Sequence, residues 1–141
     1  MSPLKASEVK VGDVHEKVVV DDLSRTQIVM YAGASGDYNP VHTDEVFATQ
    51  VAGYPSVFGH GMLTMGMTGR MLTDLVGDGR LTRFGGRFTN QVWPGDTLTT
   101  RAEVEAVREE DGQHLVDLKV ATSNQDGREV FSGYATARAD A

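Results

Sequence analysis

From Leu81 onward, the chain shows the two-residue period of strands that bury one face. Between residues 97 and 106, Leu98, Ala102 and Val104 alternate with polar or charged neighbours. Four runs of strand character cover residues 81–93, 97–110, 113–124 and 128–139. They are separated by Pro94-Gly95-Asp96, Asp111-Gly112 and Asp126-Gly127. Because Asp-Gly between such runs is a strong hairpin signal, this half of the chain predicts a long antiparallel meander.

The first half predicts one strand followed by two helical segments. Residues 14–20 are rich in β-branched side chains and indicate a short strand. Helical spacing follows, with Ser24 as the N-cap and Gln27 three residues later, as in a capping box. Gly33 and Gly36 are expected to end this helix. A second, short helix is expected to begin at Thr43.

A largely apolar helix is predicted within residues 60–79, and its lack of a polar face indicates that it is buried. Gly66 and Gly69 each cost such a helix about 1 kcal/mol relative to Ala. Their presence predicts that another backbone approaches the helix closely, as a sheet curling around it would. The expected fold is therefore α+β, with a curved antiparallel sheet packed on a central helix. We expect a single domain over residues 1–141.

The amino-acid composition limits the chemistry and the cellular location that we expect for this domain. The chain has 141 residues, 40% of them hydrophobic, which favours one folded domain over disorder. It has no cysteine, so disulfides, thiolate nucleophiles and cysteine zinc sites are excluded. Neither an apolar run of about 18 residues nor a signal-peptide core is present, so we expect no membrane span and a cytoplasmic protein.

The net charge of −7 argues against nucleic acid as a partner, because phosphate binding needs a basic face. Four arginines within a short stretch are the candidates for a local basic patch: Arg70, Arg80, Arg83 and Arg87. The alternative is that these side chains are scattered in solvent, as surface charges usually are.

The segment SGDYNPVHTDE, residues 35–45, gathers residues that handle protons. Asp37 and His42 lie on either side of Asn39-Pro40, and Pro40 drives Asn39 towards an extended conformation. Such a kink would let the carboxylate and the imidazole face one pocket and hold a water molecule. The alternative is an ordinary turn, in which Asp37 and Asn39 bond to nearby backbone.

Other chemistries fit less well. The glycines near residue 60 lack GxGxxG spacing, and Ser35 has no GxSxG elbow. Of the four histidines, His15, His42, His60 and His114, no two stand four residues apart, so a metal site is not expected.

Gly61 opens the apolar helix and is the candidate for stabilising negative charge. The first N–H groups of a helix lack partners and lie at the positive end of its dipole. A glycine there lets a ligand oxygen approach the backbone closely, and an enolate oxygen would suit that N–H. Close packing is the alternative explanation for Gly61, and packing at the turn is the one we favour for His60.

These residues together resemble the MaoC-like (R)-specific enoyl-CoA hydratases and 3-hydroxyacyl-thioester dehydratases, a family with the hotdog fold. The resemblance lies in residues 31–48, in His60-Gly61-Met62 and in VWPGDTL, residues 92–98. It implies a sheet wrapped around the helix that starts near Gly61. It also implies a homodimer, or a heterodimer with a similar chain, whose acyl tunnel lies near the interface. Methionines that would line this tunnel, or simply fill the core, are Met62, Met65, Met67 and Met71.

The resemblance also implies roles for single residues. Asp37, as the general base, and His42 would bind the water that adds to C3 of a trans-2-enoyl thioester. Asn39 would help to orient the pair or the water, and the Gly61 N–H would polarise the thioester carbonyl. The substrate would be an acyl-CoA or an acyl-carrier thioester, with no cofactor, and Arg83 and Arg87 are candidates to bind its phosphates. Two alternatives remain: a non-catalytic subunit that binds acyl chains, and a hotdog thioesterase.

Overall fold

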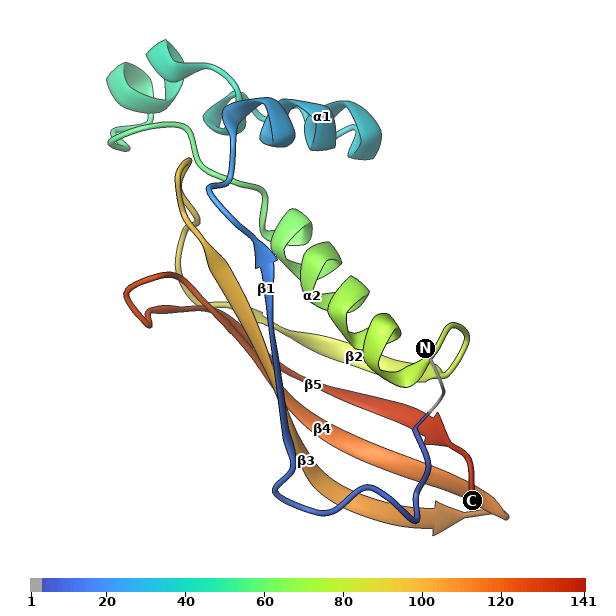
Figure 1. Cartoon of the computed structure of the whole chain (residues 1–141). Coiled ribbons are helices and arrows are strands. Elements are labelled where there is room, and N and C mark those ends of the chain that lie inside the picture. Colours follow the sequence, from blue (N-terminus) through green and yellow to red (C-terminus); the bar gives the residue numbers. More distant parts are fainter. Residues whose placement is uncertain (1–3) are drawn as a thin grey trace.

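The computed structural model describes residues 4–141 and has the predicted order of strand, helical segments, central helix and meander (Figure 1). Its elements are β1 (Val14–Val20), α1 (Arg25–Ser35), the 3₁₀ turn η1 (Pro40–His42), the π-helical turn η2 (Phe47–Val51), α2 (Gly61–Val76), β2 (Leu81–Phe88), β3 (Leu98–Glu110), β4 (Gln113–Ser123) and β5 (Glu129–Ala139). Within these residues, no helix has both the length and the apolar character needed to cross a membrane.

The strands form one antiparallel sheet in the order β1-β3-β4-β5-β2. The meander β3-β4-β5 is confirmed. The prediction was wrong for β2, which was expected as the first meander strand beside β3 but pairs with β5, while β1 takes the place beside β3. Asp111 and Gly112 both have positive φ, 51° and 77°, as a two-residue type I′ turn requires. Between β4 and β5 the loop is longer, because Asn124 Oδ1 accepts bonds from the amides of Asp126 and Arg128.

Helix α2 lies along one face of the curved sheet, as predicted (Figure 1). Met71, Leu72 and Val76 pack there against inward-facing residues of β3, β4 and β5. A Cβ at Gly69 would lie 3.1 Å from the ring of Phe84, so this glycine admits a side chain of β2. The space beside Gly66 is open, and the expectation of a close approach is wrong at that position.

A closed polar cluster lies inside this core. Thr122 Oγ1 of β4 lies 2.7 Å from Oγ1 of Thr68 on α2 and 2.7 Å from Oγ1 of Thr100 on β3. The Thr68 and Thr100 oxygens are 3.5 Å apart, and all three side chains are fully buried. A hydroxyl donates one bond and accepts others, so the three can satisfy one another. The cluster joins α2 to the middle of the sheet.

The helical boundaries before α2 agree with the prediction in part. α1 continues through Gly33 but ends at Gly36 as predicted, where this residue has a φ of 75° and donates its amide to the carbonyl of Ala32. A helix was expected from Thr43. Instead, the 3₁₀ turn η1 ends at His42, and the helical conformation that follows becomes the π-helical turn η2 at Phe47–Val51. The Asp44 carboxylate caps this turn by accepting a bond from the amide of Phe47.

Strand β2 ends at Phe88, although its predicted run extends to Trp93. The side chains of Thr89 and Asn90 each donate a 2.7 Å hydrogen bond to the carbonyl of Glu129. The amide of Thr89 still donates to the carbonyl of Val130, and these side-chain bonds then hold the chain beside β5 as it leaves the sheet.

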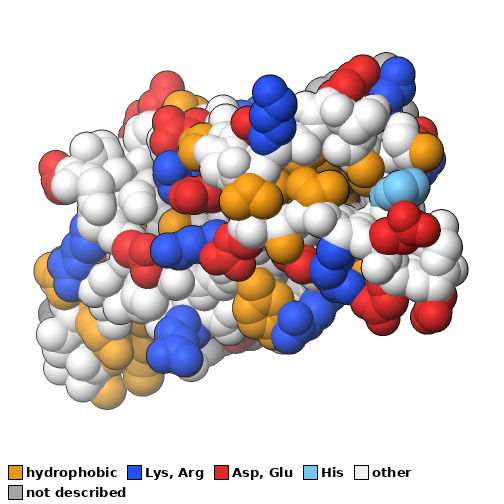
Figure 2. Space-filling model, turned by 90° about the horizontal axis from the view of Figure 1, so that it is seen from below, with side chains coloured by type: hydrophobic (Ala, Val, Ile, Leu, Met, Phe, Trp, Pro, Cys, Tyr) orange, Lys and Arg blue, Asp and Glu red, His pale blue; other side chains and the backbone are white. Residues whose placement is uncertain are grey.

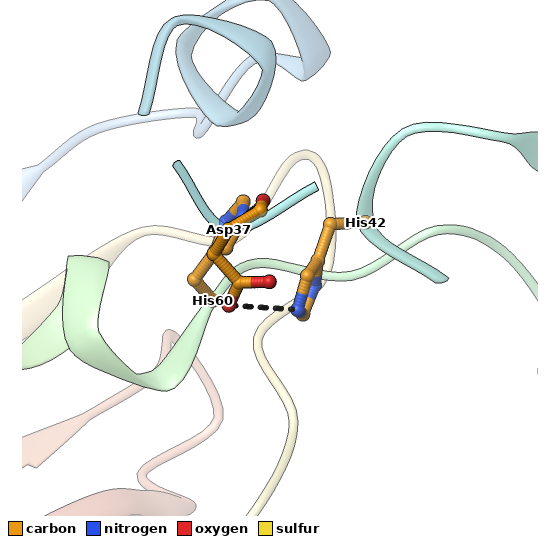
Figure 3. Close-up of side chains that lie close together, drawn as sticks. All are labelled: Asp37, His42 and His60. Atoms are coloured by element: carbon orange, nitrogen blue, oxygen red, sulfur yellow. Dashed lines mark hydrogen bonds and ion pairs between the residues drawn. The ribbon is translucent and has the colours of Figure 1, made fainter. Parts of the chain in front are cut away.

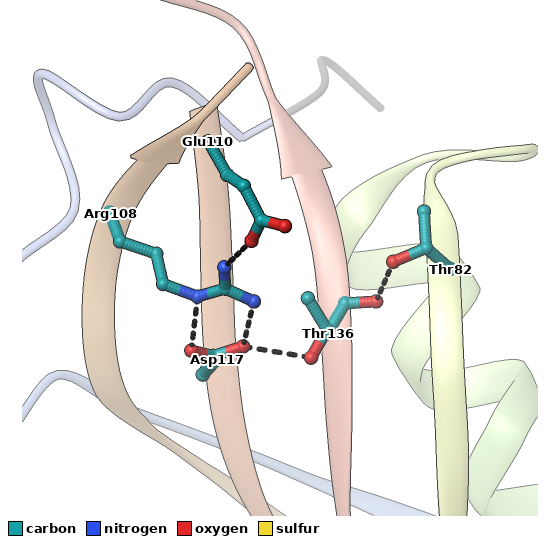
Figure 4. Close-up of polar contacts among 5 residues, drawn as sticks. All are labelled: Thr82, Arg108, Glu110, Asp117 and Thr136. Atoms are coloured by element: carbon teal, nitrogen blue, oxygen red, sulfur yellow. Dashed lines mark hydrogen bonds and ion pairs between the residues drawn. The ribbon is translucent and has the colours of Figure 1, made fainter. Parts of the chain in front are cut away.

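The face of the sheet away from α2 carries a chain of polar contacts (Figure 4). Arg108 Nε on β3 donates to Asp117 on β4 at 2.8 Å, and Thr136 Oγ1 on β5 donates to the same carboxylate at 2.8 Å. Thr82 Oγ1 on β2 donates to the carbonyl of Thr136. The hydrogen bond from Arg108 lowers the pKa of Asp117. The network links four strands side by side without reaching α2 or the loops before it.

Candidate active site

Asp37 is positioned by the end of α1. The left-handed Gly36 turns the chain out of the helix, and the amide of Asp37 then donates to Ser35 Oγ at 3.2 Å. Asp37 Oδ1 accepts a 3.2 Å bond from the amide of Asn39. The other carboxylate oxygen, Oδ2, remains available, and the side chain is 51% exposed.

His42 lies at the end of η1 and is buried. The side chain of Asn39 caps this turn by accepting a bond from the amide of Val41, so it does not bond to the dyad. His42 Nδ1 lies 2.7 Å from the carbonyl of Phe58, and this ring nitrogen must be the donor because a carbonyl only accepts. In the neutral ring Nε2 therefore carries the lone pair.

The open edge of His42 faces Asp37 (Figure 3). Nε2 lies 4.0 Å from Asp37 Oδ2, which is too long for a direct hydrogen bond but suits a bridging water. Burial lowers the pKa of His42, and so does the neighbouring His60, although the Phe58 carbonyl and the Asp37 carboxylate act in the opposite direction. The imidazole is thus kept neutral, as a proton acceptor must be.

His60 completes this cluster. It is the N-cap residue of α2, it is 2% exposed, and its ring stacks on His42 with centroids 3.8 Å apart. Its Nε2 lies 3.0 Å from the backbone carbonyl of Asp37 and donates to it. From the sequence we favoured a packing role for His60. The one sequence signal for a role in the site was its position directly before Gly61.

Gly61 is the first residue of α2, and its N–H therefore has no acceptor within the helix. A Cβ at this position would lie 2.8 Å from the ring of Phe88, so only glycine fits without moving that ring. Gly61 also lines a pocket of about 280 Å³. The other residues around this pocket are Phe58, Gly59, Thr64, Phe88, Thr89, Asn90, Gln91, Val92 and Val130.

The turn at residues 93–96 holds the two loops that lead into the helices. The amide of Leu23, before α1, donates to the carbonyl of Asp96, and the carbonyl of Leu23 accepts from Gly95. The amide of Gly59, before α2, donates to Val92. The buried Asp96 carboxylate accepts from the amide of Trp93 at 2.8 Å, which closes the turn. The VWPGDTL segment therefore fixes, through backbone hydrogen bonds, the chain just before α1 and just before α2.

The predicted substrate-binding residues lie elsewhere. Met62 is 55% exposed, while Met65 packs against the core, and neither is among the residues that line the pocket beside Gly61. Arg83 lies over the ring of Tyr134, 4.3 Å from its centroid, and Arg87 pairs with Ser132 along β2.

The arginine group does not act as one patch. Arg80 forms a 2.7 Å ion pair with Asp140, and Arg70 lies on α2, whereas Arg83 and Arg87 lie on β2. On the face shown in Figure 2, Lys and Arg side chains are interspersed with Asp and Glu side chains.

A metal ion does not suit the cluster. One ligand atom each from Asp37, His42 and His60 lies within 4.8 Å of the others. However, the two imidazole planes are stacked, only 26° apart, so their in-plane lone pairs run side by side and do not converge as zinc ligands must. His60 Nε2 is moreover engaged with the carbonyl of Asp37.

Comparison with known proteins assigns the family. A family model described as the MaoC like domain matches residues 7–125. The chain belongs to this family. Solved structures of similar shape include an R-hydratase, PhaJ1 of Pseudomonas aeruginosa, with 27% identity, a TM-score of 0.84, and coverage of 98% of this chain and 86% of that one. The chain has the hotdog fold, as expected.

MaoC-like relatives are hydratases and dehydratases of fatty-acid metabolism. The 3-hydroxyacyl-thioester dehydratase Y of Mycobacterium tuberculosis is 41% identical over 91 residues, covering 62% of this chain and 31% of that protein. The ChsH1-ChsH2 complex of the same organism has 27% identity and a TM-score of 0.76, over 92% of this chain and 98% of that one, so related hotdog proteins form hetero-oligomers. The chain spans less than half the length of the first curated relatives it matches.

Proposed function

We propose that this protein hydrates trans-2-enoyl thioesters to (R)-3-hydroxyacyl thioesters, or catalyses the reverse dehydration. The observation that carries the proposal is the 4.0 Å gap between Asp37 Oδ2 and His42 Nε2, which is the right size for one shared water. The N-terminus of α2 and the pocket beside it supply the second requirement, a place where a thioester carbonyl can meet the Gly61 N–H.

In the hydration direction, the water between the two side chains loses a proton to Asp37 as its oxygen attacks C3 of the substrate. The electron pair of the C2–C3 double bond moves onto the thioester, and the Gly61 N–H stabilises the resulting enolate oxygen. The proton taken from the water is then returned to C2. His42 holds the water through Nε2 and relays the proton. Dehydration follows the same steps in reverse.

Asn39 supports the carboxylate through its backbone. Its amide N–H bonds to Asp37 Oδ1, which leaves Oδ2 directed at the water, and its side chain holds η1 in the shape that presents His42. The orienting role that the family resemblance implies for Asn39 is thus achieved by two local hydrogen bonds.

The substrate in this proposal is an acyl-CoA or an acyl-carrier thioester, with no cofactor. The pocket beside Gly61 combines apolar side chains with Thr64, Thr89 and Asn90, and so suits the polar thioester end of an acyl chain. Residues 1–141 act as one catalytic domain. It pairs with a second hotdog chain, either its own copy or a similar one, which completes the acyl tunnel.

The test is hydration of crotonyl-CoA and longer enoyl-CoA substrates by the purified protein. Wild-type protein should convert them to the (R)-3-hydroxyacyl product, and Asp37→Asn or His42→Ala should lower kcat by roughly 10²- to 10⁴-fold. Asp44→Asn is the matched control, because it removes a carboxylate two residues from His42 while keeping an oxygen to cap η2. Full activity in both dyad variants would overturn the mechanism.

Two other outcomes would favour the alternative functions. Release of free thiol from saturated acyl-CoA would indicate a thioesterase. Inactivity on every chain length, with co-purification of a similar hotdog chain, would indicate a non-catalytic subunit, and mixing the two chains would then restore activity that does not depend on Asp37.

A further inference from the structure

His60 contacts all three parts of the proposed site. Its Nε2 donates to the carbonyl of Asp37, its ring stacks on His42, and its own backbone caps the helix that begins with Gly61. The proposed reaction steps use the other three residues directly and leave His60 without a role. A buried histidine with three such contacts requires an explanation beyond packing.

Among the hydrogen bonds of Asp37 in the described part of the chain, the one from His60 reaches beyond its own loop. The other bonds of Asp37 join it to Ser35 and Asn39, both only two residues away in the sequence. The His60 bond spans 23 residues and ends on α2, which is fixed to the sheet by the core. His42, five residues further on, is tied separately to the carbonyl of Phe58, so the bond from His60 is the direct link between the Asp37 backbone and the start of α2.

The same bond sets the position of the proton on the His60 ring, as the Phe58 carbonyl does for His42. Because Nε2 of His60 donates to a carbonyl, the neutral ring carries its lone pair on Nδ1. That atom is buried and has no hydrogen-bond partner among residues 4–141. Adding a proton there would leave an N–H without an acceptor. The ring packs against His42 with centroids 3.8 Å apart, and Tyr31 makes an edge-on contact with it.

We infer that His60 is a positioning residue: its Nε2–H holds the Asp37 backbone, and with it the carboxylate, opposite Gly61, and its stacked ring keeps the His42 ring in the orientation that directs Nε2 towards the water. The kinetic part of this inference rests on the proposed hydration. The ionisable groups that face the His42 ring are Asp37, from the loop after α1, and His60, from the start of α2. Phe58 contributes only its carbonyl and the edge of its ring.

Two substitutions separate the hydrogen bond from the stack. His60→Gln keeps an amide N–H in the place of Nε2 but removes the ring. His60→Phe keeps a ring against His42 but cannot donate to the carbonyl of Asp37. Thr68→Val is the control for a general loss of stability, because Thr68 is a buried polar residue of the same helix that does not line the pocket.

The expected result is a split between kcat and KM for crotonyl-CoA hydration. His60→Phe should lower kcat by about 10- to 100-fold with KM nearly unchanged, because a misplaced catalytic group costs rate rather than binding. His60→Gln should retain most of the wild-type kcat at high pH. Its activity should fall at a higher pH than that of wild type, because removing the stacked ring exposes His42 and lets it take up a proton more readily. Equal kcat in His60→Phe and wild type, or equal loss in both variants, would overturn the inference.

A measurement without turnover decides the inference independently of the proposed function. Nitrogen-15 NMR of the imidazoles in wild-type protein should show a proton on Nε2 of His60 and on Nδ1 of His42. A proton on Nδ1 of His60 would overturn the inference even if neither variant folds. If wild-type protein hydrates no enoyl thioester while the NMR shows the expected tautomers, the proposed function fails and the positioning role of His60 stands.

Discussion

Two polar clusters of this protein, one fully buried and one that opens to the surface at Asp37, differ in whether their hydrogen bonds are closed. Thr68, Thr100 and Thr122 bond to one another in the core, and their hydroxyl groups have partners within the cluster. At the other cluster, His42 Nε2 stops 4.0 Å short of the Asp37 carboxylate, and His60 Nδ1 has no partner in the described part of the chain. Both clusters hold α2, one at its middle and one at its N-terminus.

The difference separates a structural cluster from a reactive one. Buried polar groups that satisfy one another fix a single arrangement of helix and sheet. A carboxylate and a neutral imidazole held just beyond bonding distance leave room for a reactant, and the surrounding hydrogen bonds prevent them from collapsing onto each other. Each prediction below breaks or alters one of these clusters.

The largest effect is expected from breaking the open cluster. Asp37→Asn should reduce kcat for enoyl-CoA hydration by roughly 10²- to 10⁴-fold, the range that general acid–base groups contribute. The free energy of unfolding in urea should change little, because the side chain is half exposed and amide oxygen can still accept the bond from Asn39. A loss of stability with intact activity would show that Asp37 has a structural role, like the threonines of the closed cluster, and no catalytic one.

Two glycines of α2, Gly61 at its first position and Gly66 in its interior, allow a comparison of alanine substitutions at the site and away from it. Gly61→Ala should clash with the Phe88 ring, cost about 1–3 kcal/mol of stability and lower kcat/KM, because overpacking displaces the pocket wall. Gly66→Ala meets open space and should stabilise the protein by up to about 1 kcal/mol through helix propensity alone. Urea denaturation and steady-state kinetics on both variants would check this; similar effects at both sites would contradict it.

Breaking the closed cluster should affect stability only. Thr68→Val removes the 2.7 Å bond to Thr122 but leaves Thr122 paired with Thr100, so a loss of about 1–2 kcal/mol is expected. The kcat should stay within about two-fold of wild type, because Thr68 neither lines the pocket beside Gly61 nor belongs to the proposed reacting groups. A large loss of kcat at unchanged stability would show that the closed cluster also controls the site.

The smallest expected effect is in the pH dependence of stability. The pKa of His42 is lowered, mainly by burial. The unfolded chain binds a proton there near the ordinary value of about 6.5, whereas the folded protein resists it, so the free energy of unfolding should fall as the pH drops through and below that value. Above it, His42 contributes no slope.

Urea midpoints on either side of this value would check the sign. The slope should be reduced in His42→Ala and unchanged in Thr68→Val, because the closed cluster contains no titratable group. A wild-type slope in His42→Ala would show that the dependence arises from other groups.

The outline of the fold followed from local signals. The Ser24 cap, the glycine at position 36 and the Asp111-Gly112 turn act through neighbouring residues, so β1, α1, α2 and the meander were predictable. The early end of β2 was not, because Thr89 and Asn90 bond to Glu129, some 40 residues away in the sequence. The contact of Arg83 with the ring of Tyr134 on β5 likewise joins residues far apart in the sequence.

The sequence by itself determined the candidate pair, because Asp37 and His42 lie on one short segment whose Gly and Pro shape its bend. It also placed Gly61 at the start of a buried helix. Only the tertiary structure decided how these parts meet: the Phe58 carbonyl that selects the tautomer of His42, the pocket beside Gly61, and the His60 side chain that reaches back to Asp37. These contacts join residues 16 or more positions apart, where local propensity carries no information and packing alone sets the distance.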